Sequence, residues 1–542
     1  MASTAAGWDR VADVVVVGSG GAALTAALLA ADGGADVVVI ERAEQIGGTT
    51  AVSGGGIWVP CNAHMAGIGV ADSREDALAY IRALSKGSEA DPALVEVFVD
   101  TAAEMIAYLE RATPLRMFPT RGFRDYYSTY GVPGARPEGR SLEPVPFPVG
   151  KELPEWRERL ASRITLLTLG AYTTLEEDLS GRLPDEAELA RRKQEDVRPK
   201  GAALIGAIFK GLLDRGVDTL VRTRARELVQ ADGAVVGVRC EREGRVLRLG
   251  ARRGVVLACG GFEWDPELVR AHVGYALHPV TPPHNTGDGL RLAMQAGAAL
   301  ANMGSYWGTG TMYDPTVLRD GAPLPQFDAA RGMPGTLIVN QDARRFVNEA
   351  VPYNDFPRAF GSYDPLRVDF ANRAPAWQIF DHGVKEALPI LSMRPGEPAP
   401  AWIAQAPSIR ALAAKIGLDP DALEATLRRF DADAARGLDP EFRRHELGLQ
   451  RATPPRPLDR PPFYALPIYP GTLGTNGGPQ IDADGRVRRG GGGVVPGLFA
   501  AGNTAANAFG WAYPSGGGTL ANALTFGYRA GRRAAAEPVR VP

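Results

Sequence analysis

Residues that build disulfides and metal sites are scarce in this chain of 542 residues. Its three cysteines, Cys61, Cys240 and Cys259, are odd in number and far apart, and none belongs to a Cys-x-x-Cys pair. No disulfide framework is therefore expected, and a reducing cytoplasm is the expected location. The six histidines show no spacing to one another or to cysteine that would suit a metal, so no metal site is expected.

A strong charge of either sign is also absent. The formal net charge of −2 gives no electrostatic reason to expect nucleic acid or an anionic membrane as a partner. The first ten residues lack an apolar core and include Asp9 and Arg10, so a signal peptide is not expected. The uncharged run Val14–Ala31 has the length of a membrane helix, but its glycine cluster argues against an integral membrane segment. Peripheral membrane association is left open.

One segment near the N-terminus carries the most specific pattern. A buried parallel strand, Val14–Val17, is predicted to enter a glycine turn and an alanine-rich helix, and a second strand, Val37–Ile40, ends on an acid. Gly18 permits the tight turn, and Gly20 lets the backbone approach a pyrophosphate that faces the N–H groups at the helix start. Glu41 is placed to accept hydrogen bonds from ribose hydroxyls. This order predicts a dinucleotide site, and a glycine loop that binds nothing is the minor alternative.

The rest of the chain predicts an α/β fold with an α+β insertion. Residues 1–303 form the first part of a Rossmann-like domain, and residues 217–260 within it alternate like a β-meander with turns at 232–233 and 243–244. Residues 304–463 contain more aromatics and prolines and are predicted to be an inserted domain, with a helical stretch near 407–436. Residues 464–542 return to the first domain.

A variable region, residues 121–199, lies within the first part of that domain. Residues 121–151 are dense in proline, glycine and arginine and are predicted to form a long loop. Residues 152–199 are strongly charged and are predicted to form solvated helices, whose exposed face is expected to serve solubility alone. Residues 72–112 have the period of helices.

The fingerprint is followed by a second glycine loop, Gly47–Gly56, and later by Gly287-Asp288-Gly289 and Val495–Asn503. In this order the segments resemble the FAD-dependent fumarate reductase/3-ketosteroid dehydrogenase superfamily over nearly the whole chain. The resemblance implies an FAD-binding domain split by an inserted catalytic domain. Relatives that bind flavin covalently carry a histidine in the second loop; this loop has none, so non-covalent FAD is expected. The residues expected to bind it are Gly18, Gly20, Gly21, Ala22, Glu41, Arg42, Gly48, Thr49, Thr50, Ser53, Gly54, Gly55, Gly56, Gly260, Asp288, Gly502, Asn503, Gly518, Thr519 and Leu520.

Two branches of this superfamily differ in charge. Fumarate reductases hold a dicarboxylate with arginines, one of them at the end of an Arg-Phe-Val-Asn-Glu-x-x-x-Arg segment. Here that segment runs from Arg345 and places Tyr353 where the last arginine belongs. Their Asn-Arg-Leu-Gly-Gly is replaced by Asn507–Gly517 without arginine, and their His-Pro-Thr is replaced by Met303–Trp307. A dicarboxylate would lack charged partners here, at a high cost in free energy.

The tyrosines instead resemble those of 3-ketosteroid Δ1-dehydrogenases. These enzymes carry a Tyr-Pro-x-x-Gly motif, matched by Tyr513 and Gly517, and a tyrosine after Asn-Glu-x-x-Pro, matched by Tyr353. They also carry a third tyrosine in an Asp-Tyr segment, which Tyr126 and Tyr127 both match. The sequence does not decide between these two, and Tyr126 is chosen. A packed aromatic ring with a satisfied hydroxyl is the alternative interpretation for each tyrosine.

Desaturation of a ketone needs these groups. A hydroxyl from Tyr513 and a backbone N–H from Gly517 can polarise the ketone oxygen as an oxyanion hole does. A base must then remove the α proton, and Tyr353 is assigned this role. Free tyrosine, with a pKa of about 10, is a poor base unless a neighbour stabilises its phenolate, which is the role assigned to Tyr126.

The expected function is FAD-dependent α,β-desaturation (1,2-dehydrogenation) of a small hydrophobic ketone, in the first place a 3-ketosteroid. The same machinery would serve a monocyclic ketone of the cyclohexanone type or a Δ4-(5α)-desaturation of a steroid. A fumarate or enoate reductase and a flavin-binding protein without turnover are the rivals. No second Rossmann fingerprint is present, so a quinone-like acceptor is expected to take the electrons rather than NAD(P). The region 121–199 is the expected specificity element.

Overall fold

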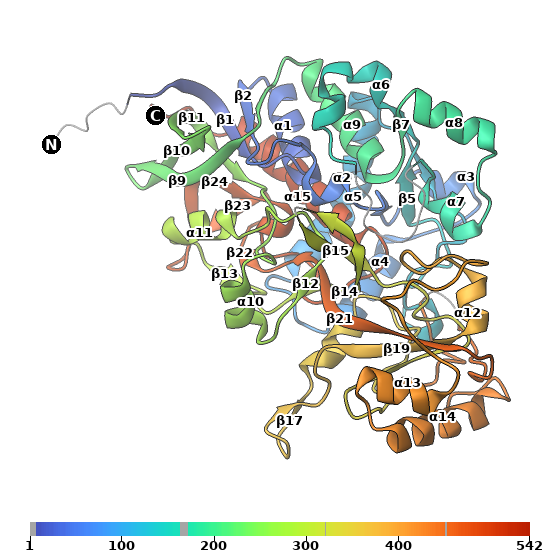
Figure 1. Ribbon diagram of the computed structural model, residues 1–542. Coiled ribbons are helices and arrows are strands. Elements are labelled where there is room, and N and C mark those ends of the chain that lie inside the picture. The colour runs from blue at the N-terminus through green and yellow to red at the C-terminus, as the bar shows by residue number, and fades with distance from the viewer. Residues whose placement is uncertain (1–6, 163–171, 320, 450–451) are drawn as a thin grey trace.

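The structure is a computed structural model that describes residues 7–162, 172–319, 321–449 and 452–542 (Figure 1). Its largest sheet has eight strands, in the order β23-β24-β11-β1-β2-β8 with β10 and β9 added beside β11. The strands are β1 (Arg10–Val17), β2 (Val37–Ile40), β8 (Asp218–Leu220), β9 (Thr223–Ala231), β10 (Ala234–Arg242), β11 (Arg245–Leu257), β23 (Arg486–Arg488) and β24 (Val494–Ala500). The sheet and its helices confirm the predicted α/β class.

The centre of this sheet is parallel and buried on both faces. Strand β1 pairs in parallel with β2 and with β11, and Val14–Val17 of β1 and the valines of β2 are almost fully buried. Such strands consist of continuous apolar residues because no face meets water. The predicted β-meander is confirmed: β9, β10 and β11 pair antiparallel, and Asp232 and Glu243 adopt positive φ in the two connecting turns.

Two helices pack closely against each other beside this sheet. Helix α1 (Gly21–Asp32) follows the fingerprint turn, and α15 (Gly518–Ala535) ends the fold. A Cβ on Gly527 would lie 2.4 Å from the Ala22 carbonyl oxygen, and a Cβ on Gly531 would lie 2.2 Å from that of Ala26. The two backbones therefore touch, which fixes the N-terminal end of α15 relative to the fingerprint.

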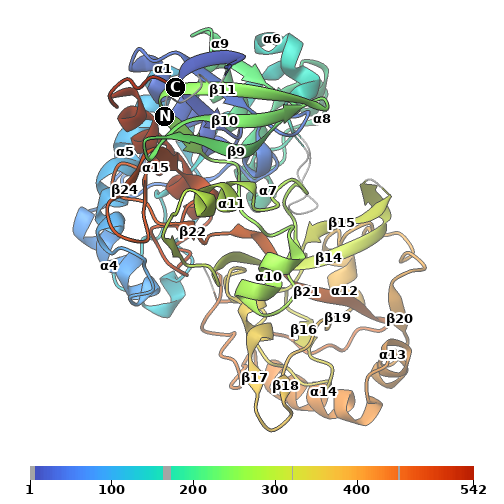
Figure 2. The same ribbon diagram turned by 90° about the vertical axis from the view of Figure 1, so that its left-hand side faces the viewer.

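The second sheet has seven strands in the order β15-β14-β21-β19-β16, and β12 and β20 pair with β21. It lies below the first sheet in Figure 2, with α13 and α14 at its outer end. Strand β21 belongs wholly to this sheet, so the chain returns to the first sheet after Thr475, later than the predicted boundary at 464. The elements are β12 (His278–Pro279), β14 (Tyr306–Arg319), β15 (Ala322–Phe327), β16 (Thr336–Val339), β19 (Ala376–Asp381), β20 (Ala404–Ala406), β21 (Phe463–Thr475), α13 (Ile409–Ile416) and α14 (Pro420–Ala434).

The remaining elements support these two sheets. Helices α4 (Arg74–Ser85) and α5 (Ala93–Ala112) confirm the predicted helical region, and α5 packs against α15. The variable region contains short elements and ends at α9 (Lys200–Leu213), which packs against α1. The other helices are α2 (Gly48–Ala51), α3 (His64–Gly67), α6 (Val149–Glu152), α7 (Leu175–Ser180), α8 (Glu186–Gln194), α10 (Pro266–Val273), α11 (Asp288–Gln295) and α12 (His382–Ala387). The other strands are β3 (Ile57–Trp58), β4 (Met117–Pro119), β5 (Ser141–Pro144), β6 (Phe147–Pro148), β7 (Val197–Arg198), β13 (Leu300–Ala301), β17 (Tyr363–Asp364), β18 (Asp369–Phe370) and β22 (Gly478–Pro479).

The uncharged run near the N-terminus divides into β1 and α1, as predicted. Across the ranges that the structure describes, none of the helices combines the length and the apolar character needed to cross a bilayer.

The contact between α1 and α15 predicts a stability change. In Gly531→Ala, the new methyl group would press on the Ala26 carbonyl oxygen, and we expect a loss of about 1–3 kcal/mol in the free energy of unfolding. Gly491→Ala is the matched control, because no heavy atom lies within 4 Å of a Cβ at that position. Thermal unfolding of the two variants beside the wild type measures the difference. Equal midpoints for all three proteins would contradict the close backbone contact.

Candidate active site

Two adjoining cavities lie where the predicted site residues meet. The larger, of about 610 Å³, is lined by the ends of β1, β2 and β11 and by the first turns of α1 and α15. The smaller, of about 370 Å³, contains the tyrosines. Thr49, Val52, Thr519 and Leu520 line both, so the cavities meet at these residues. Of the residues predicted to bind FAD, all line one cavity or the other except Gly518, which is buried at the start of α15.

The fingerprint glycines of the larger cavity differ in what requires them. Gly18 adopts a φ of +110°, and a Cβ there would lie 2.4 Å from the Ala258 carbonyl oxygen, so packing inside the protein excludes any side chain. A Cβ on Gly20 would lie no closer than 3.7 Å to any protein atom. The space beside Gly20, at the N-terminus of α1, is therefore available to a ligand. A helix N-terminus with exposed N–H groups favours an anionic group such as a pyrophosphate.

The same cavity also contains charged residues. Glu41 is buried, and it accepts hydrogen bonds from the Ser19 hydroxyl at 2.6 Å and from the Ala43 N–H at 2.8 Å. Burial raises the pKa of Glu41, and these hydrogen bonds only partly offset the effect. Asp288 begins α11 and forms ion pairs with Arg42 at 3.1 Å and with Arg224 at 2.6 Å. Arg224 was not predicted from the sequence, since a β-meander residue carries no motif.

The lining of the larger cavity fits FAD. Two helix N-termini and a side-chain-free position at Gly20 suit the pyrophosphate, and the Glu41 carboxylate retains acceptor capacity for ribose hydroxyls. The cavity continues past Thr49 into the smaller one, beside the glycines of the loop Ser53–Gly56. A flat ring that followed the pyrophosphate would therefore lie close to backbone atoms rather than side chains.

Three tyrosine rings meet in the smaller cavity, each from a different part of the chain. The ring centroids of Tyr126 and Tyr353 are 5.3 Å apart, those of Tyr353 and Tyr513 are 5.6 Å apart, and those of Tyr126 and Tyr513 are 5.9 Å apart. The Tyr353 hydroxyl donates a hydrogen bond to the Tyr513 hydroxyl at 3.0 Å. The proton of Tyr513 is then available for another acceptor in the cavity.

The structure distinguishes the two adjacent tyrosines that the sequence did not. Tyr126 lines the cavity, whereas the Tyr127 hydroxyl donates to the Asp355 carboxylate at 2.8 Å. The Tyr126 N–H and the Tyr80 hydroxyl both donate to the Pro514 carbonyl, at 3.3 Å and 2.7 Å. These hydrogen bonds connect the loop of Tyr126 directly to the loop of Tyr513.

Burial dominates the acidity of the three tyrosines. It raises the pKa of Tyr353 and of Tyr126 well above the ordinary value, and the neighbouring tyrosines raise that of Tyr353 further. Burial also raises the pKa of Tyr513, although the hydrogen bond from Tyr353 partly offsets the effect. All three side chains are therefore neutral near pH 7 in the protein without ligand.

Gly517 supplies the second donor beside Tyr513. It adopts a φ of +95° immediately before α15, and a Cβ there would lie 2.5 Å from the Gly56 carbonyl oxygen. No other residue fits this position without moving the glycine loop. The Tyr513 hydroxyl and the Gly517 N–H thus lie at one end of the cavity, at the N-terminus of a long helix, where a developing negative charge is favoured.

Several residues of the smaller cavity were not predicted. They include Leu175 and Leu179 on α7, the buried Lys200, and Asp328 with Arg331 after β15. The expectation that residues 152–199 serve solubility alone does not hold for α7. Leu175 and Leu179 were the sequence signal that could have indicated this role. Two leucines four residues apart in a charged segment occupy one face of a helix, which can line a cavity.

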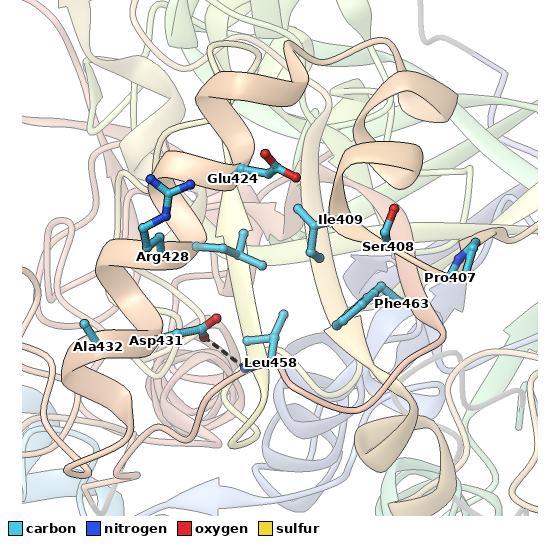
Figure 3. Close-up of a pocket in the computed structure, with 10 residues that line it drawn as sticks. Pro407, Ser408, Ile409, Glu424, Arg428, Asp431, Ala432, Leu458 and Phe463 are labelled. Atoms are coloured by element: carbon cyan, nitrogen blue, oxygen red, sulfur yellow. Dashed lines mark hydrogen bonds between the residues drawn. The ribbon is translucent and has the colours of Figure 1, made fainter.

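Another hollow, of about 660 Å³, lies elsewhere. It opens between α13 and α14 at the outer end of the second sheet, and its walls include Ser408, Glu424, Arg428 and Phe463 (Figure 3). None of the residues predicted to bind FAD or to act on a ketone lines it. This hollow is not the active site.

Known proteins resemble this chain in sequence and in fold. The sequence profile of the family described as the FAD binding domain matches residues 13–520. A 3-oxosteroid 1-dehydrogenase of Mycobacterium tuberculosis is 34% identical, with 96% of this chain and 97% of the relative covered. A 4-oxocyclohexanecarboxylate 2-dehydrogenase of Sinomonas cyclohexanicum is 36% identical, with 97% of this chain and 93% of the relative covered. The crystal structure of the 3-ketosteroid delta1-dehydrogenase from Sterolibacterium denitrificans in complex with 1,4-androstadiene-3,17-dione superposes with a TM-score of 0.87 at 32% identity, covering 97% of this chain and 100% of that one.

The two fingerprint glycines predict different outcomes when a side chain is added. Gly20→Val is expected to fold normally, because its φ of −72° suits valine and no protein atom is close, but to lose FAD. Gly18→Ala is expected to be destabilised itself, since its methyl group would press on the Ala258 carbonyl. Flavin absorbance per polypeptide and the unfolding midpoint of the apoprotein measure the two effects. A Gly20→Val protein that retains full flavin would contradict the position assigned to the pyrophosphate.

Proposed function

This chain belongs to the FAD-binding domain family, and we propose that it desaturates a 3-ketosteroid between C2 and C1, the α and β carbons on that side of the ketone. It uses FAD, as expected from the sequence, and it is an oxidoreductase acting on CH–CH bonds. The observation that carries the proposal is the meeting of Tyr126, Tyr353, Tyr513 and Gly517 in one cavity that joins the FAD cavity.

The ketone oxygen binds between the Tyr513 hydroxyl and the Gly517 N–H in this proposal. Both donors lie at the N-terminus of α15, and both are fixed before substrate enters, by the loop of Tyr126 and by Gly56. Donors that are fixed in advance stabilise an enolate oxygen without reorganising, and each is typically worth about 10²–10³ in rate.

Tyr353 is the proposed base. As its phenolate it takes the α proton, while the C–H bond electrons form the new double bond and a hydride leaves the β carbon. Tyr126, 5.3 Å away between ring centroids, is the proposed donor that stabilises the phenolate. FAD, when bound, supplies the acceptor for the hydride. We propose that FAD is held without a covalent bond, since residues 47–56 contain no histidine.

The charges of the smaller cavity support a neutral, hydrophobic substrate. Arg331 is paired with Asp328, and Lys200 with Asp178, so these cations are already neutralised. Asp328 also has one buried carboxylate oxygen without a hydrogen-bond partner among the described residues. A carboxylate on the substrate would find no spare cation in this part of the lining and would face Asp328. Desaturation of a 4-oxocyclohexanecarboxylate is therefore the second candidate, favoured only by the 36% identical relative.

Two further features belong to this proposal. A quinone-like molecule is the proposed acceptor of the electrons, because the chain has no second dinucleotide fingerprint. The reducing cytoplasm is the proposed location, because all three cysteines are free thiols.

A panel of ketones tests the proposal. The purified protein is mixed anaerobically with 4-androstenedione, a 5α-saturated 3-ketosteroid, cyclohexanone, 4-oxocyclohexanecarboxylate or succinate, and the flavin absorbance is followed by stopped flow. Rapid bleaching by a 3-ketosteroid is expected. Bleaching by 4-oxocyclohexanecarboxylate alone would favour the second candidate. No bleaching by any ketone, together with reoxidation of the reduced protein by fumarate, would overturn the desaturase.

Conservative changes to the tyrosines separate their roles. We expect Tyr513→Phe and Tyr353→Phe each to slow flavin reduction by about 10²-fold or more, because one loses a donor to the ketone oxygen and the other the base. Tyr127→Phe is the matched control, since its hydroxyl contacts Asp355 outside the cavity. Single-turnover rates under anaerobic conditions measure all three. Slowing by Tyr127→Phe but not by Tyr353→Phe would contradict the assignment.

The raised pKa of Tyr353 predicts a pH dependence. A base must be deprotonated to act, and burial places the pKa of Tyr353 above the ordinary value of about 10. The deprotonated fraction therefore increases about tenfold for each pH unit below that pKa. The rate of flavin reduction is expected to rise continuously between about pH 6 and pH 9 in the wild type and to lose this slope in Tyr353→Phe. A plateau starting near pH 7 would assign the base to another group.

A further inference from the structure

The short helix α7 (Leu175–Ser180) forms a wall of the smaller cavity at its mouth. Leu175 and Leu179 lie four residues apart, and both line the cavity. Leu175 contacts the glycine loop, since a Cβ on Gly54 or on Gly56 would lie 3.9 Å from its side chain. Leu179 is 53% exposed although it faces the cavity, so a bound molecule that covers it would gain apolar contact.

Such a helix does not hold its place alone. Six residues are far too few for a stable isolated helix in water. Its first turn is held by Glu143, a fully buried carboxylate that accepts from the N–H groups of Leu175 at 2.8 Å and Glu176 at 2.9 Å. Arg192 forms two hydrogen bonds of 2.9 Å with the Glu177 carboxylate on the outer side of the helix. The position of α7 is therefore imposed by charged groups around it.

Lys200 joins this helix to the glycine loop. Its side chain is completely buried and forms an ion pair with Asp178, the residue of α7 just before Leu179. Its backbone adopts a φ of +59° and lies against Gly55, where a Cβ would be 2.3 Å from the Lys200 carbonyl carbon. A non-glycine residue in this conformation costs free energy, so surrounding contacts must hold it there.

We propose that Leu175 and Leu179 are specificity-determining residues, which favour a multi-ring ketone over a single ring, and that Lys200 is the positioning residue that fixes them relative to the glycine loop. The inference rests on the proposed function for the identity of the ligand. It narrows the specificity region expected from the sequence, residues 121–199, to residues 175–179, and it adds Lys200. A steroid long enough to reach the cavity mouth covers Leu179, whereas a cyclohexanone that binds at Tyr513 and Gly517 does not reach it.

The first test removes the contact at the mouth. Leu179→Ala is expected to weaken binding of 4-androstenedione about tenfold, the usual value of burying one leucine side chain in part, and to leave that of cyclohexanone unchanged. The dissociation constants are measured from the shift that each ketone causes in the flavin absorbance, with both leucine substitutions placed in a Tyr353→Phe background that reduces its flavin slowly. Leu183→Ala is the matched control, because Leu183 is 59% exposed and does not line the cavity.

The outcomes separate this inference from the proposed function. Selective weakening of steroid binding supports the inference even if no ketone bleaches the flavin. The absence of bleaching would overturn only the proposed desaturase function. Equal effects of Leu179→Ala on both ketones, or equal effects of Leu179→Ala and Leu183→Ala, would overturn the inference. If steroids bleach the flavin and Leu179→Ala does not change the selectivity, the proposed desaturase function is supported and the inference about Leu179 is overturned.

The second test addresses Lys200. Lys200→Met leaves the Asp178 carboxylate buried without its ion pair, and we expect it to raise the ratio of the steroid KM to the cyclohexanone KM about tenfold or more. The double variant Lys200→Met/Asp178→Leu removes both charges together. We expect this double variant to recover stability but not steroid selectivity. The test therefore remains decisive even if the single variant fails to fold. Wild-type selectivity in the folded double variant would overturn the role of Lys200.

Discussion

The contact between the backbones of α1 and α15 determines where the chemistry takes place. Gly527 and Gly531 bring α15 against Ala22 and Ala26 so closely that no side chain fits between the helices. The N-terminal end of α15 is then fixed beside the fingerprint turn. Gly517, which rests on the Gly56 carbonyl, and Tyr513 immediately precede that helix. The proposed donors for a ketone oxygen are therefore held in place by the same packing that shapes the FAD cavity.

Tyr353 reaches the site from the second sheet, and buried charges hold the segment before it. Arg345 forms ion pairs with Glu349 at 2.7 Å and with Asp439 at 2.8 Å, all three almost fully buried. Arg331 donates to the Glu349 carbonyl at 2.6 Å and to the Val351 carbonyl at 3.0 Å. Removal of one partner from such a network leaves a buried charge, which typically costs about 3–5 kcal/mol. The arginine that opens the resemblance to fumarate reductases thus serves here to position a tyrosine.

Local patterns predicted much of this structure. The sequence predicted the parallel strands around the fingerprint, the β-meander and the split α/β fold. Patterns of neighbouring residues were enough to predict these elements. The residues predicted to bind FAD line the two cavities, apart from Gly518. The features that the sequence did not predict depend on contacts between distant segments. The choice of Tyr126 over Tyr127 follows from Asp355, and the place of α7 follows from Glu143 and Lys200.

The position of the new double bond tests the central claim most directly. A 3-ketosteroid that carries deuterium at C1 and C2 is oxidised to completion by the protein with an artificial electron acceptor, and the product is analysed by mass spectrometry. The account predicts the loss of one label from each of the two carbons, because Tyr353 removes the α hydrogen and the hydride leaves the neighbouring β carbon. Retention of all label at C1 and C2, with hydrogen lost from C4 and C5 or from neither pair, would contradict it.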